Sequence, residues 1–378
     1  MIASDLPVRY FPRKQTTLNL QAAIKYVLAQ RGYKAGKYSV GYQACDDSSP
    51  QQGSGAFAKC AANARAYAGN SSVIGLVGTW SSVCSGIELP ILNRAPGGSL
   101  GLISPSNTYI GLTHAGAGTG PGEPGRYYPT GHRNFVRIIS PDDFQAVADA
   151  LLAKRLGAKR VFVLDGHDGY GLNVAGAFKR AAAKSGLRIA GTGFWTDDQT
   201  SFDALAGRVA RAKPDAVFLA GFACPECGKL VAGLRGGLGA KTPIIGSDGW
   251  GVFEDLAKAA GPAAEGMYVS IPGLPAEKLP AAGGKMTRLF GAPDLGSGGP
   301  AYAAQAVAVL LDAIAASDGT RASVTRHLLA ARVQRGIIGS FSFDRNGDPT
   351  FAPTMIFRIR GRKGKLDRVI TPPPALLS

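Results

Sequence analysis

Four polar residues lie at points of the sequence where they could hold a small molecule that carries both charges. Ser82 follows the apolar run 73–78 and opens a helix, and Ser106 and Thr108 follow the next short strand. Hydroxyls and free backbone N–H groups in such places suit a carboxylate. Asp248 follows another strand and suits a cationic group. Together these residues would bind the two poles of an amino acid.

Two glycine-rich patterns raise the question of an enzyme. GGSLG (97–101) matches the G-x-S-x-G nucleophile pattern, but Ser99 precedes its strand, whereas the motif requires a strand before the serine and a helix after it. GAGTGPG (116–122) is similar to nucleotide-binding loops, yet it follows no strand and opens no helix. The sequence has no HExxH, Walker or EF-hand pattern. We therefore expect no catalytic activity and no cofactor.

The odd number of cysteines, five in all, leaves one thiol without a partner if the others pair. The pair in CPEC could form a redox motif, half a zinc site or a small disulfide loop. A zinc site would need two more ligands, and the four histidines show no metal spacing. We predict a Cys224–Cys227 disulfide and a second one between two of Cys45, Cys60 and Cys84, with the pairing left open. Disulfides would place the protein outside the cytosol.

Short apolar runs alternate with helical segments along the chain, which predicts parallel sheets with helices on both faces. The predicted strands are 39–44, 73–78, 160–165, 216–221 and 243–248, followed late in the chain by 337–345, 354–360 and 366–371. The predicted helices are 16–31, 55–68, 142–157, 171–186, 201–212, 226–238, 278–290, 300–316 and 321–332. The fold class is therefore α/β.

The length of 378 residues exceeds what one hydrophobic core usually supports, so we expect two lobes. The alternation breaks at a Gly/Pro-rich stretch, 114–131, which cannot be regular structure. We predict a first lobe of residues 1–131 plus about 272–335, and a second of 132–271 plus about 336–378. The chain would cross between the lobes more than once, forming a hinge with the ligand in the cleft.

The net charge of +16 comes from 42 Lys and Arg against 26 Asp and Glu. Most basic residues are scattered along helices, and the densest cluster, 358–368, is interrupted by glycines and suggests a solvated hairpin. An anionic partner is the alternative. No basic run is interleaved with aromatic residues in a stacking pattern, so we expect no binding to nucleic acid.

The order of several landmarks resembles the type I periplasmic binding proteins, especially the branched-chain amino acid receptors of ABC importers. The landmarks are VIGLVGTWSS (73–82), LISPSNT (102–108), NFVRIISPDDFQA (134–146), RVFVLDGHDGYG (160–171), KPDAVFLAGF (213–222), IIGSDGW (244–250) and AYAAQAVAVLLDAIAASDGT (301–320). Each is weak alone, but they cover essentially the whole chain in the right order. The resemblance implies two Rossmann-like lobes with parallel central sheets and a non-enzymatic, ligand-binding function.

The resemblance also implies site residues. By similarity, Ser82, Ser106 and Thr108 hold the ligand carboxylate, and Asp248 falls where such receptors place a glutamate against the ammonium. Tyr170 and Phe222 match two positions that are usually occupied by tyrosine in the family. Phe222 therefore lacks the hydroxyl that this position usually carries.

Two tryptophans, Trp80 and Trp250, flank the proposed pocket and would line its side-chain end. The loop 114–131 is longer than usual in the family. Both this loop and the Asp for Glu exchange affect the choice of ligand more than the mode of binding.

Two classes of function fit this reading. The first is an extracytoplasmic solute receptor, in the periplasm or on the outer face of the membrane, that delivers its ligand to ABC transporter permease subunits. The second is the ligand-sensing domain of a larger receptor or of a cytoplasmic transcription regulator. The start, MIASDLPV, lacks a basic segment followed by an apolar stretch, so we expect any signal, membrane anchor or fused domain to precede it.

Overall fold

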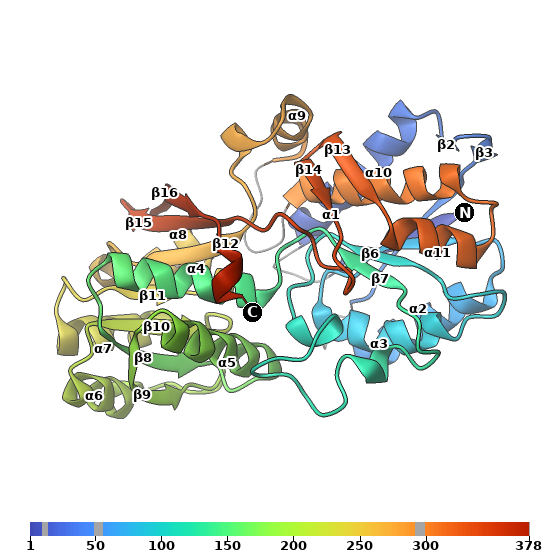
Figure 1. Cartoon of the computed structure of the whole chain (residues 1–378). Helices are drawn as coiled ribbons and strands as arrows, with labels where there is room; N and C mark the ends of the chain where they lie inside the picture. Colours follow the sequence, from blue (N-terminus) through green and yellow to red (C-terminus); the bar gives the residue numbers. More distant parts are fainter. Residues whose placement is uncertain (10–13, 49–55, 292–298, 378) are drawn as a thin grey trace. The chain divides into compact units, whose positions relative to one another are not determined.

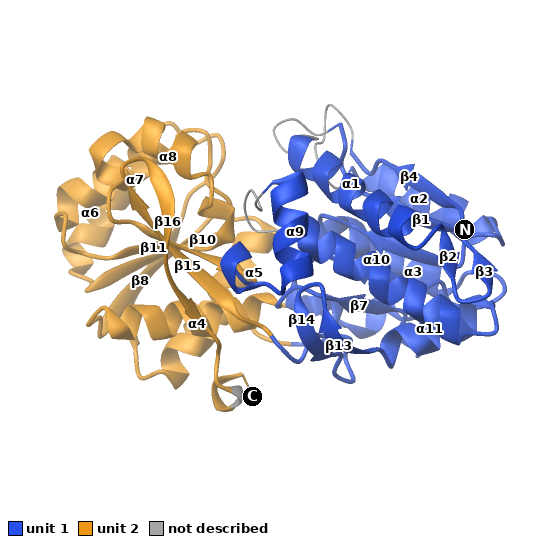
Figure 2. Cartoon of the chain, turned by 90° about the horizontal axis from the view of Figure 1, so that it is seen from above, with its two compact units in different colours: residues 1–115, 120–140, 274–351 blue, residues 116–119, 141–273, 352–378 orange. Residues whose placement is uncertain are grey.

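A computed structural model describes residues 1–9, 14–48, 56–291 and 299–377. These residues form two compact units (Figures 1 and 2). Unit 1 comprises Met1–Ala115, Gly120–Ser140 and Leu274–Phe351, and unit 2 comprises Gly116–Thr119, Pro141–Gly273 and Ala352–Ser378. Each unit is therefore assembled from segments that are far apart in the sequence.

Unit 1 is built on a parallel sheet that is buried on both faces. Its strand order is β4 (Tyr42–Cys45), β1 (Ile2–Asp5), β5 (Gly75–Gly78), β6 (Leu102–Ser104) and β7 (Phe135–Arg137). Because side chains alternate along a strand, consecutive apolar residues enter different cores. Val77 and Ile103 thus belong to one core cluster, while Leu76 and Leu102 belong to another.

Helices cover both faces of this sheet. Figure 1 shows α1 (Lys14–Gln30), α10 (Gly299–Ala316) and α11 (Arg321–Leu329) on one side, and α2 (Phe57–Gly69) and α3 (Ser82–Asn93) on the other. The predicted helix 55–68 corresponds to α2, and residue 55 lies outside the described residues. Helix α1 presents Leu20, Ile24 and Leu28, spaced four apart, to the core, where each contributes about 1.5–3 kcal/mol on burial.

Helix α10 is long and apolar enough to span a membrane by composition, but 83% of its 18-residue window is buried inside unit 1. It packs against α1, α9 (Ala281–Phe290) and the sheet. Residues such as Val307, Leu310 and Ile314 belong to the core cluster that includes the strands. The helix is therefore the central core helix of unit 1.

Unit 2 contains a larger sheet in which parallel strands meet an antiparallel hairpin. The order is β16 (Lys363–Ile370), β15 (Thr354–Arg360), β12 (Tyr268–Pro272), β11 (Ile244–Gly246), β10 (Ala216–Ala220), β8 (Arg160–Asp165) and β9 (Arg188–Phe194). Strands β15 and β16 are antiparallel to their neighbours, and the other five are parallel. The mixed α/β class with parallel central sheets is confirmed.

The helices of unit 2 lie on two sides of its sheet (Figure 2). Helices α4 (Asp142–Arg155) and α5 (Gly169–Lys184) share a core cluster with β8 and β10. Helices α6 (Asp203–Ala212), α7 (Cys227–Leu238) and α8 (Phe253–Ala260) pack against one another in sequence order. Helix α5 begins where the Asp168 carboxylate caps the backbone N–H of Gly171, at 2.6 Å.

Two predicted boundaries are wrong, because residues 132–140 and 336–351 belong to unit 1 and not to the second lobe. The predicted strand 337–345 contains β14 (Gly339–Ser342), which forms a hairpin with the preceding β13 (Arg332–Gly336), and its Ile338 and Phe341 enter the core of unit 1. After this hairpin, the chain returns to the sheet of unit 2 at β15.

The Gly/Pro-rich stretch 114–131 is divided between the units. Its residues 116–119 belong to unit 2, where Gly118 lies against α5. A Cβ on Gly118 would be 2.6 Å from the Cα of Asn173, and its φ of +91° is unfavourable for other residues. This close approach explains a glycine that superficially suggested a nucleotide-binding loop.

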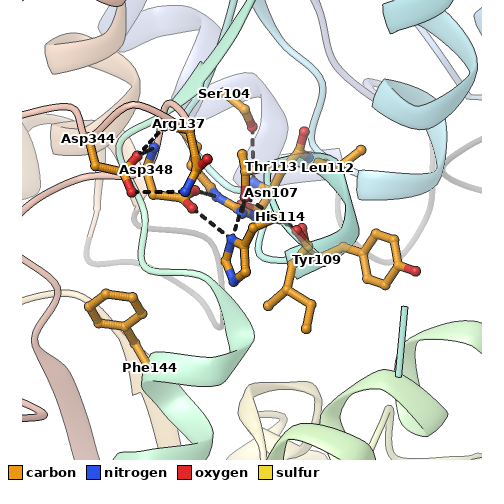
Figure 3. A network of polar contacts seen from close by, with 12 residues as sticks. Ser104, Asn107, Tyr109, Leu112, Thr113, His114, Arg137, Phe144, Asp344 and Asp348 are labelled. Carbon is orange, nitrogen blue, oxygen red and sulfur yellow. Dashed lines mark hydrogen bonds and ion pairs between the residues drawn. The ribbon is translucent and has the colours of Figure 1, made fainter. Parts of the chain in front are cut away.

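Asp348 of unit 1 accepts hydrogen bonds from two residues that are distant in the sequence (Figure 3). The Nε of Arg137, on β7, donates to its Oδ1 at 2.6 Å, and Nδ1 of His114 lies 3.1 Å from its Oδ2. Arg137 also donates to the carbonyls of Asn107 and Tyr109, at 3.2 and 2.8 Å. Burial alone would raise the pKa of Asp348, but the Arg137 charge and the His114 contact lower it to about 2.

The structure contains two disulfides. Cys224 pairs with Cys227 as predicted, and Cys60 of α2 pairs with Cys84 of α3, which decides the choice that the sequence left open. Cys45, at the end of β4, is the remaining free cysteine, and burial raises the pKa of its thiol.

We expect thiol titration of the denatured, unreduced protein to find one free thiol, and titration after reduction to find five. Cys45→Ser should have none before reduction. In the native protein, Cys45 should react slowly because the thiolate is the reactive form and its pKa is raised. Finding five thiols without reductant would contradict both disulfides.

Candidate functional site

The first group of predicted site residues lies at the carboxyl end of the unit 1 sheet, and we call Ser82, Thr108 and the N-terminus of α3 the unit 1 half-site. Ser82 is the first residue of α3, and Ser81 caps the helix by accepting from the Val83 N–H at 3.3 Å. The N-terminus of a helix carries partial positive charge and unpaired N–H groups. It is therefore a suitable place for a carboxylate.

The two hydroxyls of this half-site, those of Ser82 and Thr108, each keep a proton to donate. The Ser82 Oγ accepts from the backbone N–H of Tyr109 at 3.3 Å, which leaves the serine proton for another acceptor. Thr108 is 6% exposed, and its hydroxyl has no partner among the described residues. Both groups can thus donate to an anion.

Ser106 has a different role from the predicted one, which was to bind the ligand carboxylate. Its hydroxyl donates to the carbonyls of Thr79 and Trp80, at 3.3 and 3.1 Å, and its N–H donates to the Ser104 Oγ at 3.2 Å. A serine hydroxyl has only one proton to donate, so Ser106 holds two loops together and has no donor left for a ligand. Trp80 itself is partly buried and packs against the core cluster of unit 1.

Asn107 connects the same loops. Its side-chain amide donates to the carbonyls of Thr79 and Trp80, at 2.9 and 3.1 Å, and its Oδ1 accepts from the Ser85 hydroxyl at 2.5 Å. These bonds connect the loop after β6 to the start of α3. The start of α3 and the loop that carries Thr108 are therefore held in a fixed geometry.

The second group lies in unit 2 and centres on Asp248; we call Asp248, Tyr170 and Phe222 the unit 2 half-site. Asp248 begins a short 3₁₀ helix, Asp248–Trp250, directly after β11. Its Oδ1 accepts from the Tyr170 hydroxyl in a short hydrogen bond and from Gln145 Nε2 at 3.2 Å. Asp248 is nearly buried, with 8% of its surface exposed. The structure thus brings Tyr170 and Asp248 into contact.

The electrostatics of this half-site keep protons on the neighbours of Asp248. Burial, and then the charges of Asp248 and Asp142, raise the pKa of Tyr170 well above its ordinary value, so the phenol remains a donor. Burial also raises the pKa of Asp149 well above its ordinary value, although the hydrogen bond from Ser270 opposes the shift. Burial therefore shifts the Asp149 carboxyl toward its protonated form.

The two remaining aromatic predictions have different outcomes. Phe222 is 43% exposed, and its ring lies 4.7 Å from that of Tyr170, centroid to centroid, so it offers an apolar surface beside the carboxylate. Trp250 has no exposed surface and packs edge-to-face on Trp195 at 5.4 Å. Trp250 therefore belongs to the core of unit 2, and the prediction that it lines a pocket is wrong.

Helix α4 contributes polar residues that sequence reasoning did not identify. Gln145 donates to Asp248 and also to the Ser270 hydroxyl at 2.8 Å, and that hydroxyl donates to Asp149 at 3.0 Å. Asp142, Gln145 and Asp149 recur at the spacing of one helix face, and all three are fully buried. A buried polar stripe on an otherwise alanine-rich helix is the signal that could have found them. No group of three His, Cys, Asp or Glu in the described part of the chain is arranged to hold a metal ion.

Comparison with known proteins identifies the family. A family model described as "Periplasmic binding protein" matches residues 15–365. The chain belongs to this family, whose members bind solutes and are not enzymes, as the resemblance of the sequence landmarks implied.

Individual relatives are more distant. The chain is 29% identical over 144 residues to the leucine-, isoleucine-, valine-, threonine- and alanine-binding protein of Pseudomonas aeruginosa, a match that covers 38% of each chain. It is 26% identical over 238 residues to a Leu/Ile/Val-binding protein homologue of Brucella abortus, covering 61% of this chain and 62% of the relative. The matched stretches thus span less than two thirds of these curated relatives.

Solved structures share the fold over nearly the whole chain. A leucine-binding protein LivK from Thermotoga maritima superposes with a TM-score of 0.78 at 21% identity, covering 98% of both chains. The substrate-binding protein LivJ of Streptococcus pneumoniae, solved with isoleucine, gives 0.74 at 18% identity and also covers 98% of both chains. A solute-binding protein of Rhodopseudomonas palustris, solved with p-hydroxybenzoic acid, gives 0.76 at 16% identity, covering 99% of this chain and 97% of that one.

Proposed function

We propose that the protein is an extracytoplasmic solute receptor that captures an amino acid and delivers it to the permease of an ABC transporter. The observation that carries the proposal is the opposite chemistry of the two half-sites. Unit 1 offers hydroxyl donors at the N-terminus of α3, and unit 2 offers a nearly buried carboxylate, Asp248, beside the phenol of Tyr170. The unit 1 half-site suits a carboxylate and the unit 2 half-site suits an ammonium group, and an amino acid carries both.

Asp248 favours an amino acid over a simple organic acid. Relatives of the same fold were solved with isoleucine and with aromatic acids such as benzoate, so the fold accommodates both classes. The negative charge of Asp248 repels the carboxylate of a simple organic acid and attracts an α-ammonium group.

The aromatic residues favour an apolar side chain. Phe222 has no hydroxyl and presents an exposed ring next to Tyr170. Amino acids with aliphatic or aromatic side chains would gain from contact with these rings. The names of the relatives in Pseudomonas and Brucella, which refer to leucine, isoleucine and valine, support the same class.

The location and the transporter partner follow from the same proposal. Two disulfides suit an oxidising compartment outside the cytosol. We therefore place the receptor in the periplasm or on the outer face of the membrane, where it would dock on permease subunits.

Calorimetric titration with a panel of amino acids tests the proposal, and Thr108 provides the sharpest check of the unit 1 half-site. Thr108→Val keeps the shape but removes a donor to a charged group, which is worth about 1.5–3 kcal/mol. We expect affinity to fall roughly 10- to 100-fold.

The matched control is Thr287→Val on α9, whose hydroxyl bonds only within its own helix, to the carbonyl of Gly283. It should leave affinity unchanged. A loss of less than about threefold in Thr108→Val would remove Thr108 from the site. If no amino acid binds and an aromatic acid does, the proposed ligand class is wrong.

A further inference from the structure

Unit 1 contains a cavity of about 710 Å³ that is distinct from the unit 1 half-site. It lies between α1, α9, α10, α11 and β13, elements that Figure 1 shows on the side of the sheet opposite α2 and α3. None of its lining residues belongs to either half-site. Its volume is within the usual range of sites for small molecules, roughly 300–1,000 Å³.

The floor of this cavity is apolar. It is formed by one face of α10 together with residues from α1, α9 and the β13–β14 hairpin. The apolar side chains that line it include Val27, Met286, Ala308, Val309, Ala313 and Ile337. A floor of this kind binds the apolar body of a ligand by excluding water.

One amide among the lining residues has a donor that makes no hydrogen bond within the protein. Gln305 is 2% exposed, and its Oε1 accepts from the backbone N–H of Ile338 at 3.3 Å. In the described part of the chain, its Nε2 makes no hydrogen bond. The carboxamide is confined from the other side, because a Cβ on Gly336 would be 2.4 Å from its Oε1. Nε2 is not fully buried and Gln305 lines the cavity, so this donor is available to an acceptor supplied from outside the protein.

The rim of the cavity is cationic. Arg332 and Arg335 are exposed and make no ion pair with any described residue, and Lys285 lies over the ring of Tyr26 at 5.3 Å. His327 is a further polar lining residue.

A single acidic residue lines the cavity, and it is already paired. Asp312 forms an ion pair with Arg31 at 2.5 Å. The positive charges of Lys285, Arg332 and Arg335 are therefore not neutralised by the protein.

We propose that this cavity binds an amphipathic anion, a small molecule with an apolar body and one anionic headgroup. The apolar body would lie on the α10 floor, and the headgroup would meet Arg332, Arg335 and Lys285, with Gln305 Nε2 as a hydrogen-bond donor. Both features are needed together, because the rim alone would bind any anion weakly and the floor alone would accept any apolar molecule. The site is independent of the amino acid site and does not rest on the proposed function.

The test uses two probes of known chemistry. 8-Anilino-1-naphthalenesulfonate, an aromatic body with one sulfonate, should bind the wild-type protein at one site with increased fluorescence. Octanoate should displace it, and 1-octanol, which has the same chain without the charge, should need at least a tenfold higher concentration. Equal displacement by octanol would overturn the anionic part of the proposal.

Variants locate the probe. Arg332→Glu combined with Arg335→Glu should weaken binding of both anions at least tenfold. The matched control is Arg65→Glu with Arg94→Glu, which makes the same charge change at exposed positions of unit 1 outside the cavity. If both double variants weakened probe binding equally, the cause would be the overall charge of the protein, and the proposed site would be wrong.

A filling variant keeps the test independent of charge. Ala330 is exposed at the rim, so Ala330→Trp can occlude the cavity without a change in the buried core. It should abolish probe binding, leave the thermal melting curve nearly unchanged, and leave amino acid affinity as in the wild type. Unchanged probe binding in Ala330→Trp would place the probe elsewhere and reject this cavity as its site.

Discussion

Asp248→Ala is expected to weaken amino acid binding by roughly 30- to 3,000-fold. Truncating one partner of a buried charge pair costs about 2–5 kcal/mol, because the ligand's ammonium group is left without its counter-charge. The variant also removes the acceptor of the Tyr170 hydroxyl and of Gln145 Nε2. Calorimetric titration against the amino acid that binds wild type most tightly measures the effect.

Two comparison variants separate charge from shape. Asp248→Asn retains the side-chain size and one oxygen acceptor, so the loss that remains in this variant reports the charge itself. Asp255→Ala, at an exposed position on α8, removes a carboxylate of unit 2 outside the half-site and should bind as wild type. If Asp248→Ala changes affinity less than about threefold, the pairing with an ammonium group is wrong, and a ligand without an amino group becomes the better hypothesis.

Arg137→Met should lower the free energy of unfolding by about 3–5 kcal/mol. The Arg137 side chain is fully buried and that of Asp348 is 5% exposed, so the variant leaves a buried carboxylate without its charge partner. Urea denaturation at neutral pH measures the loss. Arg345→Met, which removes an exposed arginine from the same unit, should change stability by less than about 1 kcal/mol.

The pH dependence of stability provides a second test of the Arg137–Asp348 ion pair. The folded pKa of Asp348, about 2, lies below its ordinary value of 3.8, so the carboxylate stabilises the folded state above the ordinary value. That contribution should disappear as the pH falls from 3.8 toward 2, and Arg137→Met should lose most of this dependence. If Arg137→Met were as stable as wild type and lost stability in the same way at acidic pH, the ion pair would contribute little.

The fold class could be predicted from the sequence because most strands and helices carry their own local pattern. Strands such as β8 and β10 are continuous apolar runs, and helices such as α1 have apolar residues at helical spacing. Strand β1 was missed because IASD is only four residues long and half polar, although it lies between β4 and β5 in the sheet. Strand β9 was missed for a related reason, since as an edge strand it has no buried run.

The site was only partly accessible from sequence because burial and hydrogen bonding are decided by distant contacts. The position of Asp248 after a strand was informative, and the structure places Tyr170 on it from 78 residues away. Ser106 looked identical in character to Thr108, but its donors are satisfied by neighbouring loops. The Arg137–Asp348 pair spans 211 residues and has no local signature at either end, which is why the boundary near 336 was misplaced.

The position of α10 in the core has a consequence for the order in which the protein can be made. The sheet of unit 1 begins with β1 at residue 2, but the helix that buries one of its faces is not synthesised until residues 299–316. At roughly 5–20 residues per second, the early strands wait roughly 15 to 60 seconds for it. The core of unit 1 therefore cannot be completed until most of the chain has been translated. A chain whose core is incomplete can still be threaded through a narrow membrane channel, whereas a fully folded domain is too wide to pass.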